Sequence, residues 1–146
     1  MQEIVMRPMK VEDLESALEL WNSDAGVKVR NYDDSPEAIT RFLGRNPNTC
    51  RVLVKGTSIV GTALCGSDGR RGFLYHFMVR KDLRHQGFGR MLLSAVYEQL
   101  RFQGIAKSGL VVFCNNEIGI SFWEKQGWIK RDDLFYYDFP LNESAK

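Results

Sequence analysis

The stretch Arg84-His85-Gln86-Gly87-Phe88-Gly89 lies between an apolar run and a helical segment. The run before it, residues 73–79, has the composition of a buried strand, and residues 90–103 after it favour a helix. A loop of this kind exposes several backbone N–H groups at the positive end of a helix dipole, where phosphate binds. Gly87 and Gly89 lack a Cβ atom, so a phosphate group can approach the backbone closely. The stretch therefore predicts a phosphate-binding loop.

The composition is typical of a globular protein. The chain has 146 residues, 44% hydrophobic and 26% charged, so we expect one domain over residues 1–146. The net charge of +2 does not favour a nucleic-acid-binding face. Apolar runs are too short to span a bilayer, and the N-terminus lacks the pattern of a secretion signal. Cys50, Cys65 and Cys114 form neither a zinc pattern nor a disulfide framework. We therefore expect a cytoplasmic protein that binds no metal, nucleic acid or membrane.

Hydrophobic spacing and turn residues predict the element order β-α-α-β-β-β-α-β-α-β-β. The predicted strands cover residues 4–6, 50–55, 58–65, 72–79, 109–113, 128–129 and 134–139, and the predicted helices cover residues 11–24, 36–44, 90–103 and 116–126. Only the unit from residue 73 to residue 113 suggests a parallel crossover connection. We therefore expect an α/β fold with a mixed, largely antiparallel sheet, unlike the repeating βαβ pattern of dinucleotide-binding proteins.

This order, with Arg84-x-x-Gly87-x-Gly89 after a strand, resembles the GNAT superfamily of acyl-CoA-dependent N-acyltransferases. A second segment, Asn116-x-x-Gly119-Ile120-x-Phe122-Trp123-Glu124-Lys125-x-Gly127-Trp128, is similar to a late motif of that family. Two motifs at a typical separation are more specific than either alone, and the resemblance covers nearly the whole chain. It implies a three-layer α-β-α sandwich. The segment Asp68-Gly69-x-Arg71-Gly72 is also similar to a bacterial subgroup, the YpeA-like proteins.

The resemblance implies an N-acetyltransferase that uses acetyl-CoA. The amine of a small molecule, protein or peptide would attack the thioester directly in a ternary complex. The pantetheine arm would enter a gap between the fourth and fifth strands and pair with the main chain of one of them, and the loop would hold the pyrophosphate. The helix that begins at Asn116 would flank the thioester. The residues expected to contact the cofactor are Phe77, Met78, Val79, Arg84, His85, Gln86, Gly87, Phe88, Gly89, Arg90, Asn116 and Trp123.

Two positions depart from the family pattern. Many members have a Tyr, the acid that protonates the thiolate, where this chain has Trp123, and some have a Glu, the base, where it has Val111. Neither Trp nor Val can take these roles. The strand over residues 72–79 instead offers Tyr75 and His76 as catalytic candidates, and histidine is the residue type most often used as a general base. The alternative is that both are structural. Because strand side chains alternate, we expect the two to face opposite sides of the sheet.

The acceptor site is expected between the first two helices and the strand ends. Tyr32, Asp33 and Asp34 lie in that connection, and the carboxylates would attract a cationic amine. The alternative is a solvated loop in which Asp34 or Ser35 caps the second helix.

Two other functions and one other mechanism are alternatives to this prediction. Without the usual acid and base, the chain could be a weakly catalytic acyl-CoA-binding or sensor protein. A P-loop nucleotide binder is disfavoured because no Gly-Lys-Ser/Thr follows the loop. An acyl-cysteine intermediate is disfavoured because the sequence places no partner near a cysteine. A homodimer is compatible with the resemblance.

Overall fold

The computed structural model describes residues 2–24 and 27–146, and over these residues the chain forms a five-stranded sheet in the order β1-β2-β3-β4-β5. The strands are β1 (Ile4–Pro8), β2 (Cys50–Lys55), β3 (Ser58–Ser67), β4 (Gly72–Val79) and β5 (Ser108–Gly109). Neighbours from β1 to β4 are antiparallel, and β5 is parallel to β4. The mixed sheet confirms the α/β class predicted from the sequence.

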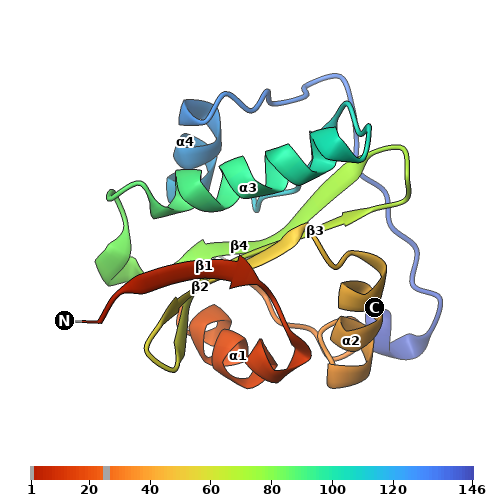
Figure 1. The fold of residues 1–146 in the computed structure, drawn as a ribbon. Coiled ribbons are helices and arrows are strands. Elements are labelled where there is room, and N and C mark those ends of the chain that lie inside the picture. The colour runs from red at the N-terminus through yellow and green to blue at the C-terminus, as the bar shows by residue number, and fades with distance from the viewer. Residues whose placement is uncertain (1, 25–26) are drawn as a thin grey trace.

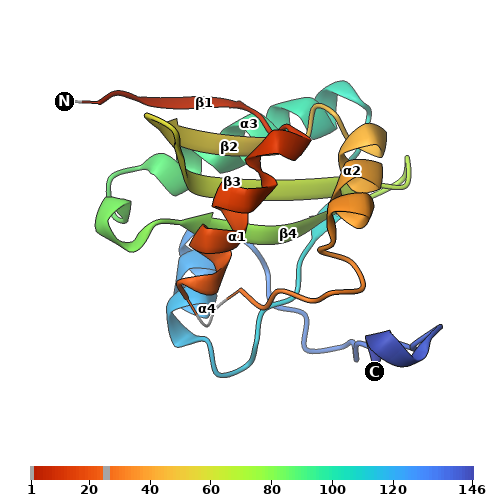
Figure 2. The ribbon, with the colours of Figure 1, turned by 90° about the horizontal axis from the view of Figure 1, so that it is seen from below.

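Helices cover both faces of this sheet. The first pair, α1 (Leu14–Asn22) and α2 (Pro36–Arg45), lies on one face, and the second pair, α3 (Phe88–Phe102) and α4 (Glu117–Lys125), lies on the other (Figure 1). Figure 2 shows α1 and α2 crossing in front of the strands. Short 3-10 turns are η1 (Val11–Asp13), η2 (Lys81–Leu83) and η3 (Glu143–Ala145). None of the helices in the described part of the chain is long and apolar enough to cross a membrane.

The start of α2 follows directly from its sequence. Ser35 has an extended backbone, and its Oγ accepts a hydrogen bond from the N–H of Ala38 at 3.2 Å. Pro36 occupies the first helical position, where its missing N–H costs nothing. Of the two N-cap candidates that the sequence offered, Ser35 is the one that caps the helix.

Each face of the sheet has its own apolar core. The core under α3 contains buried side chains from strands and helix, among them Leu53, Val60, Leu92 and Val96. The core under α1 and α2 likewise contains Trp21, Ile39, Val52 and Leu64. Because burial of apolar surface is the main favourable contribution to folding, these two cores hold the three layers together.

A β-bulge interrupts the pairing of β3 with β4. Thr62 faces Met78 and Leu64 faces Tyr75, so Ala63 alone opposes two residues of β4, His76 and Phe77. His76 has a φ of 44°, in the left-handed region that a residue with a Cβ atom rarely adopts. The bulge therefore changes the side-chain alternation in the middle of β4.

The bulge places Tyr75 and His76 on the same face. The Tyr75 ring lies 5.9 Å from that of Phe42 in α2, and the His76 ring lies 4.5 Å from that of Trp21 in α1. The expectation that these two side chains face opposite sides is wrong, because the extra residue shifts the two-residue period by one. Phe77 now faces the α4 side, where its ring stacks on that of Phe122.

The C-terminal third departs from the predicted strands. β5 covers only Ser108–Gly109, and Val111, expected in a buried strand, is 60% exposed. Residues 128–129 and 134–139 form no strand, and their large apolar side chains are exposed: Ile129, Leu134, Phe135, Tyr136, Tyr137 and Phe139. These segments have strand propensity, but a strand forms only when a neighbouring strand satisfies its backbone groups, and propensity does not supply that neighbour.

We expect Thr62→Val to destabilise the protein strongly. The buried Thr62 hydroxyl accepts a hydrogen bond from Trp21 Nε1 at 2.8 Å and donates one to the His76 carbonyl at 2.6 Å. Leaving both partners unpaired lowers the free energy of unfolding by about 2–4 kcal/mol. Denaturant unfolding measures the change. Thr40→Val is the control, because the exposed Thr40 hydroxyl bonds only within α2. An equal loss of unfolding free energy in the two variants would contradict the role given to the Thr62 hydroxyl.

Candidate functional site

The predicted phosphate loop lies between η2 and α3. Gly87 occupies the N-cap of α3 with a φ of 89°, and His85 has a φ of 64°. Left-handed residues within a turn aim successive N–H groups into one concavity, and the first turn of α3 adds N–H groups at the positive end of its dipole. A Cβ atom added at Gly87 would meet no atom within 4 Å. The loop thus presents backbone donors to open space, which suits an anion.

Arg84 joins this loop to the opposite side of the sheet. Its Nε donates to the carbonyl of Val79 at 2.9 Å, and its Nη2 lies 2.8 Å from Asp24 Oδ2, just beyond the end of α1. The guanidinium therefore fixes the last residue of β4 and the start of the connection between α1 and α2. Arg90, exposed on the first turn of α3, supplies a second positive charge near the loop.

The edge of β4 before the loop is open. β4 pairs with β5 only at Gly72 and Phe73, so in the described part of the chain residues 74–79 have no strand pairing on that side. Met78 pairs with Thr62 of β3 on the other side. An extended chain can add to such an edge through main-chain hydrogen bonds. The open edge leads directly toward the phosphate loop.

An aromatic cluster packs on one face of this edge. The Phe77 ring lies 5.3 Å from that of Phe122 and 4.9 Å from that of Trp123. Trp123 also lies 5.1 Å from Trp128, whose Nε1 donates to the hydroxyl of Tyr97 at 2.7 Å. Trp123 is therefore packed beside β4, where its indole can shape the site but cannot protonate a thiolate.

Asn116 begins α4. Its Oδ1 accepts a hydrogen bond from the N–H of Gly119 at 3.0 Å. The approach is close, because a Cβ atom on Gly119 would lie 2.5 Å from Asn116 Nδ2. The cap uses one lone pair of Oδ1, so Nδ2 and the second lone pair of Oδ1 are the groups of Asn116 that could contact a cofactor.

His76 and Asp34 form a pair that is largely buried. His76 Nε2 lies 2.7 Å from Asp34 Oδ1, and the two side chains are 15% and 5% exposed. The other carboxylate oxygen, Oδ2, accepts the N–H of Arg30 at 2.9 Å. Asp34 is thus held by His76 and by its own turn, so its side chain is buried. The rest of the alternative expected from the sequence is found, because residues 31–33 are exposed and Ser35 caps α2.

The other candidates from the sequence lie around this pair. Asp33 is exposed, and partial desolvation together with the charge of Asp34 raises the pKa of its carboxyl group. Partial burial, followed by the nearby Tyr136 and Asp33, raises the pKa of Tyr75, so its phenol is protonated at neutral pH and cannot act as a base. Tyr32, in the same connection, is 38% exposed.

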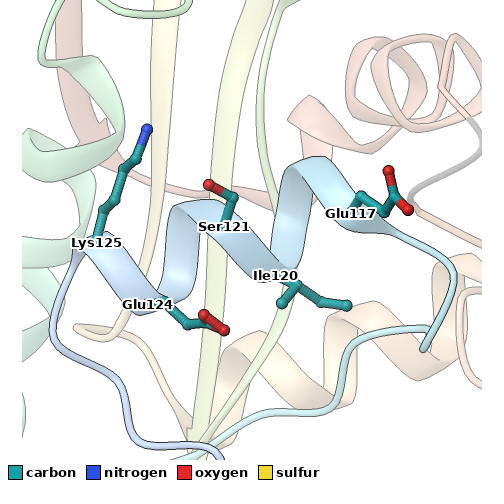
Figure 3. A pocket seen from close by; sticks show the side chains of 5 residues that line it. All are labelled: Glu117, Ile120, Ser121, Glu124 and Lys125. Atoms are coloured by element: carbon teal, nitrogen blue, oxygen red, sulfur yellow. The ribbon is translucent and has the colours of Figure 1, made fainter.

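Two shallow hollows lie near these elements. The first, of about 490 Å³, lies at the end of α1 and is lined by Asn22, Ser23, Asp24, Val27, Lys28, Val29 and Phe113. It lies beside the carboxylate that binds Arg84, in the region where the acceptor was expected. The second, of about 460 Å³, is lined by five side chains of α4 alone (Figure 3). A hollow formed by one helix holds a ligand poorly, because binding sites are normally enclosed by several elements.

Neither metal ions nor cysteine chemistry finds support in the site. No three His, Cys, Asp or Glu side chains among the described residues are grouped to hold a metal ion. Burial raises the pKa of the Cys50 thiol to about 12 and that of Cys65 to about 11. Both are therefore thiols at neutral pH and poor nucleophiles, and Cys114 is exposed.

Comparison with known proteins assigns the family. The sequence model of the acetyltransferase (GNAT) family matches residues 14–128. This chain belongs to the GNAT family. It is 29% identical over 141 residues to acetyltransferase SG1711 of Sodalis glossinidius, with 97% of this chain and 98% of that protein covered. It is 30% identical over 120 residues to acetyltransferase ECA0875 of Pectobacterium atrosepticum, with 82% and 84% covered.

The fold agrees with this assignment. The crystal structure of PaiA N-acetyltransferase from Thermoplasma acidophilum in complex with coenzyme A has a TM-score of 0.73 at 20% identity, over 85% of this chain and 88% of that one. This GNAT protein is therefore an acyltransferase with acetyl-CoA as its acetyl donor. The resemblance to GNAT proteins found in the sequence is confirmed.

Two contacts of the site had no signal in the sequence. The pair Asp34–His76 joins residues 42 apart, and the pair Arg84–Asp24 joins residues 60 apart. Both Asp34 and His76 were candidates, but for separate roles. The bulge in β4 was the missing information, since regular alternation does not tell which face His76 takes.

We expect opposite effects from two glycine substitutions in helices. Gly119→Ala displaces the Asn116 cap and lowers the free energy of unfolding by about 1 kcal/mol. At Gly44, in α2, an added Cβ atom meets no other atom within 4 Å. Gly44→Ala therefore raises the free energy of unfolding by about 0.5–1 kcal/mol, because alanine favours the helix. Denaturant unfolding measures both changes. Stabilisation by Gly119→Ala would show that the cap does not hold the start of α4.

Proposed function

We propose that this GNAT protein transfers the acetyl group of acetyl-CoA directly to a primary amine in a ternary complex. One observation carries the proposal: the open edge of β4 over residues 74–79 runs into the phosphate loop over residues 84–89. A pantetheine arm paired with that edge would bring its diphosphate to the loop N–H groups. A single continuous surface would then hold both parts of the cofactor.

On the donor side, the backbone does most of the binding. Main-chain groups of Phe77, Met78 and Val79 would face the pantetheine arm, and the N–H groups of residues 84–90 would surround the diphosphate. Trp123 would lie beside the thioester through its packing on Phe77. An N–H of β4 directed at the thioester oxygen would stabilise the oxyanion that forms on attack.

On the acceptor side, charge selects the substrate. Exposed Asp33 and the carboxylate of Asp24 lie along the connection after α1, where Tyr32 adds an exposed aromatic side chain. A cationic amine would be attracted to this region before it loses a proton and attacks. Asp34 belongs to the same segment, but it acts on His76 rather than on the amine. We therefore propose Tyr32 and Asp33 as acceptor contacts.

A catalytic role fits better than that of a sensor. The curated relatives are acetyltransferases, and the site retains an imidazole on β4 although the family's Tyr and Glu are replaced. The departing thiolate needs no dedicated acid, because an alkyl thiol has a pKa of about 8.5 and water can reprotonate its anion.

Ligand binding and turnover test the proposal together. We expect acetyl-CoA to raise the melting temperature, since a ligand that binds only the folded state stabilises it. We expect acetyl transfer to at least one class in a panel of polyamines, amino acids, aminoglycosides, peptide N-termini and lysine peptides. The release of free CoA thiol measures this transfer. Binding of acetyl-CoA without transfer to any of these amines would favour the alternative of an acyl-CoA sensor protein. No thermal shift at millimolar acetyl-CoA would refute both.

Gly89→Asp should weaken CoA binding more than Gly89→Asn does. The two substitutions have nearly the same volume, so they share any clash with Phe122 and Phe77, which lie 3.2 and 3.3 Å from an added Cβ atom. Only the aspartate adds a charge that repels the diphosphate. We expect a dissociation constant at least about tenfold higher for the aspartate variant, measured by calorimetry. Equal affinities in two folded variants would refute the phosphate-loop assignment.

A further inference from the structure

We propose that Asp34 and His76 form a catalytic dyad in which Nδ1 of His76 takes the proton of the attacking amine and Asp34 is a positioning residue. The inference rests on the proposed transfer to an amine. It names the base for a family member in which Val111 replaces the carboxylate.

The contact with Asp34 determines which ring nitrogen carries hydrogen. An ionised carboxylate only accepts hydrogen bonds, so at a separation of 2.7 Å Nε2 of His76 is the donor. In the neutral imidazole the lone pair is then on Nδ1. The carboxylate cannot rotate freely, because Oδ2 accepts the N–H of Arg30 and the N–H of Asp34 donates to the Arg30 carbonyl, both at 2.9 Å.

The backbone around His76 is also held in place. The Thr62 hydroxyl donates to its carbonyl and accepts from Trp21 Nε1, and the Trp21 ring contacts the imidazole at an angle of 51°. A left-handed φ on a residue with a Cβ atom is unfavourable and persists only where the surroundings enforce it. Here the enforced conformation turns the imidazole toward the connection that carries the proposed acceptor contacts.

The charges around the imidazole suit a base. The connection contributes Asp34, Asp33 and Arg30, β4 itself contributes the neutral phenol of Tyr75, and α1 contributes the uncharged Trp21. When His76 gains a proton, the pair with Asp34 becomes an ion pair in a largely buried place. The carboxylate thus stabilises the product of proton transfer as well as the orientation of the ring.

The step balances without any further reactant. The lone pair of the neutral amine forms a bond to the thioester carbon, and the carbonyl π pair moves to oxygen. Nδ1 takes one proton from the nitrogen, the oxyanion re-forms the carbonyl, and the C–S bond breaks. The CoA thiolate then takes a proton from water or from the imidazolium. The products are the N-acetylated amine and CoA thiol.

The Asp34→Asn variant distinguishes a dyad from a structural contact. The amide can still accept the N–H of Arg30, but its NH₂ group donates to Nε2 and forces the hydrogen onto Nδ1, which removes the lone pair. We expect kcat to fall by about 100-fold or more while KM for acetyl-CoA changes little. Asp133→Asn is the matched control, because it removes a carboxylate from an exposed pair with Arg131 and should leave kcat unchanged.

Two further kinetic results are expected. His76→Gln lowers kcat as much as Asp34→Asn, and it removes the loss of rate that accompanies imidazole protonation at low pH. The double variant is no slower than His76→Gln alone, because the two residues act as one unit. A kcat for Asp34→Asn within about threefold of the unmodified protein, or losses that multiply in the double variant, would overturn the dyad.

The tautomer gives a test that needs no activity. The chain has two histidines, His76 and His85, so the imidazole ¹⁵N spectrum of the labelled protein is simple, and His76→Gln assigns it. We expect the neutral Nε2–H form for His76; a neutral Nδ1–H form would overturn the proposal, even if Asp34→Asn fails to fold. If the kinetics contradict the dyad while acetyl-CoA binding and transfer persist, the proposed function stands.

Discussion

The hydroxyl of Thr62 holds together the two features on which the site depends. It lies fully buried in the sheet, where it binds the indole N–H of Trp21 and the carbonyl of His76. That carbonyl belongs to the extra residue of the bulge, so the hydroxyl supports the irregular backbone from the neighbouring strand. Without the extra residue, Tyr75 and His76 would lie on opposite faces, and the imidazole would face the core under α3, away from Asp34.

The bulge gives the two faces of β4 different side chains and different neighbours. On the face covered by α1 and α2, β4 presents Tyr75 and His76 toward the connection that contains Asp34. On the other face it packs Phe77 against the aromatic side chains of α4. Its edge over residues 74–79 is left for an extended ligand, and its C-terminal end leads to the phosphate loop. Arg84 then joins that end to Asp24, so an ion pair links the proposed phosphate loop to the connection between α1 and α2.

The sequence predicted those parts of the structure whose causes are local. The Ser35-Pro36 start of α2, the glycine-containing loop before α3 and the position of α4 each depend on a few neighbouring residues, and spacing rules detect them. Contacts between distant residues, such as Asp34 with His76, were not predictable, because nothing local shows where a bulge interrupts a strand. The prediction of strands over residues 128–129 and 134–139 was wrong for a related reason. Strand propensity is a local property, but a strand forms only beside a neighbouring strand.

The replacement of the family's usual acid and base has a physical consequence for where catalysis takes place. Val111 is exposed and cannot titrate, and Trp123 is packed among aromatic rings on the α4 side of β4. Titratable groups gather instead on the other face, where a buried carboxylate faces an imidazole and a phenol lies beside it. The proposed base, His76, would approach the thioester from the side of the connection between α1 and α2. In the proposed mechanism the attacking amine would pass the carboxylates that attract it before it meets the group that takes its proton, and the aromatic face would shield the thioester from water.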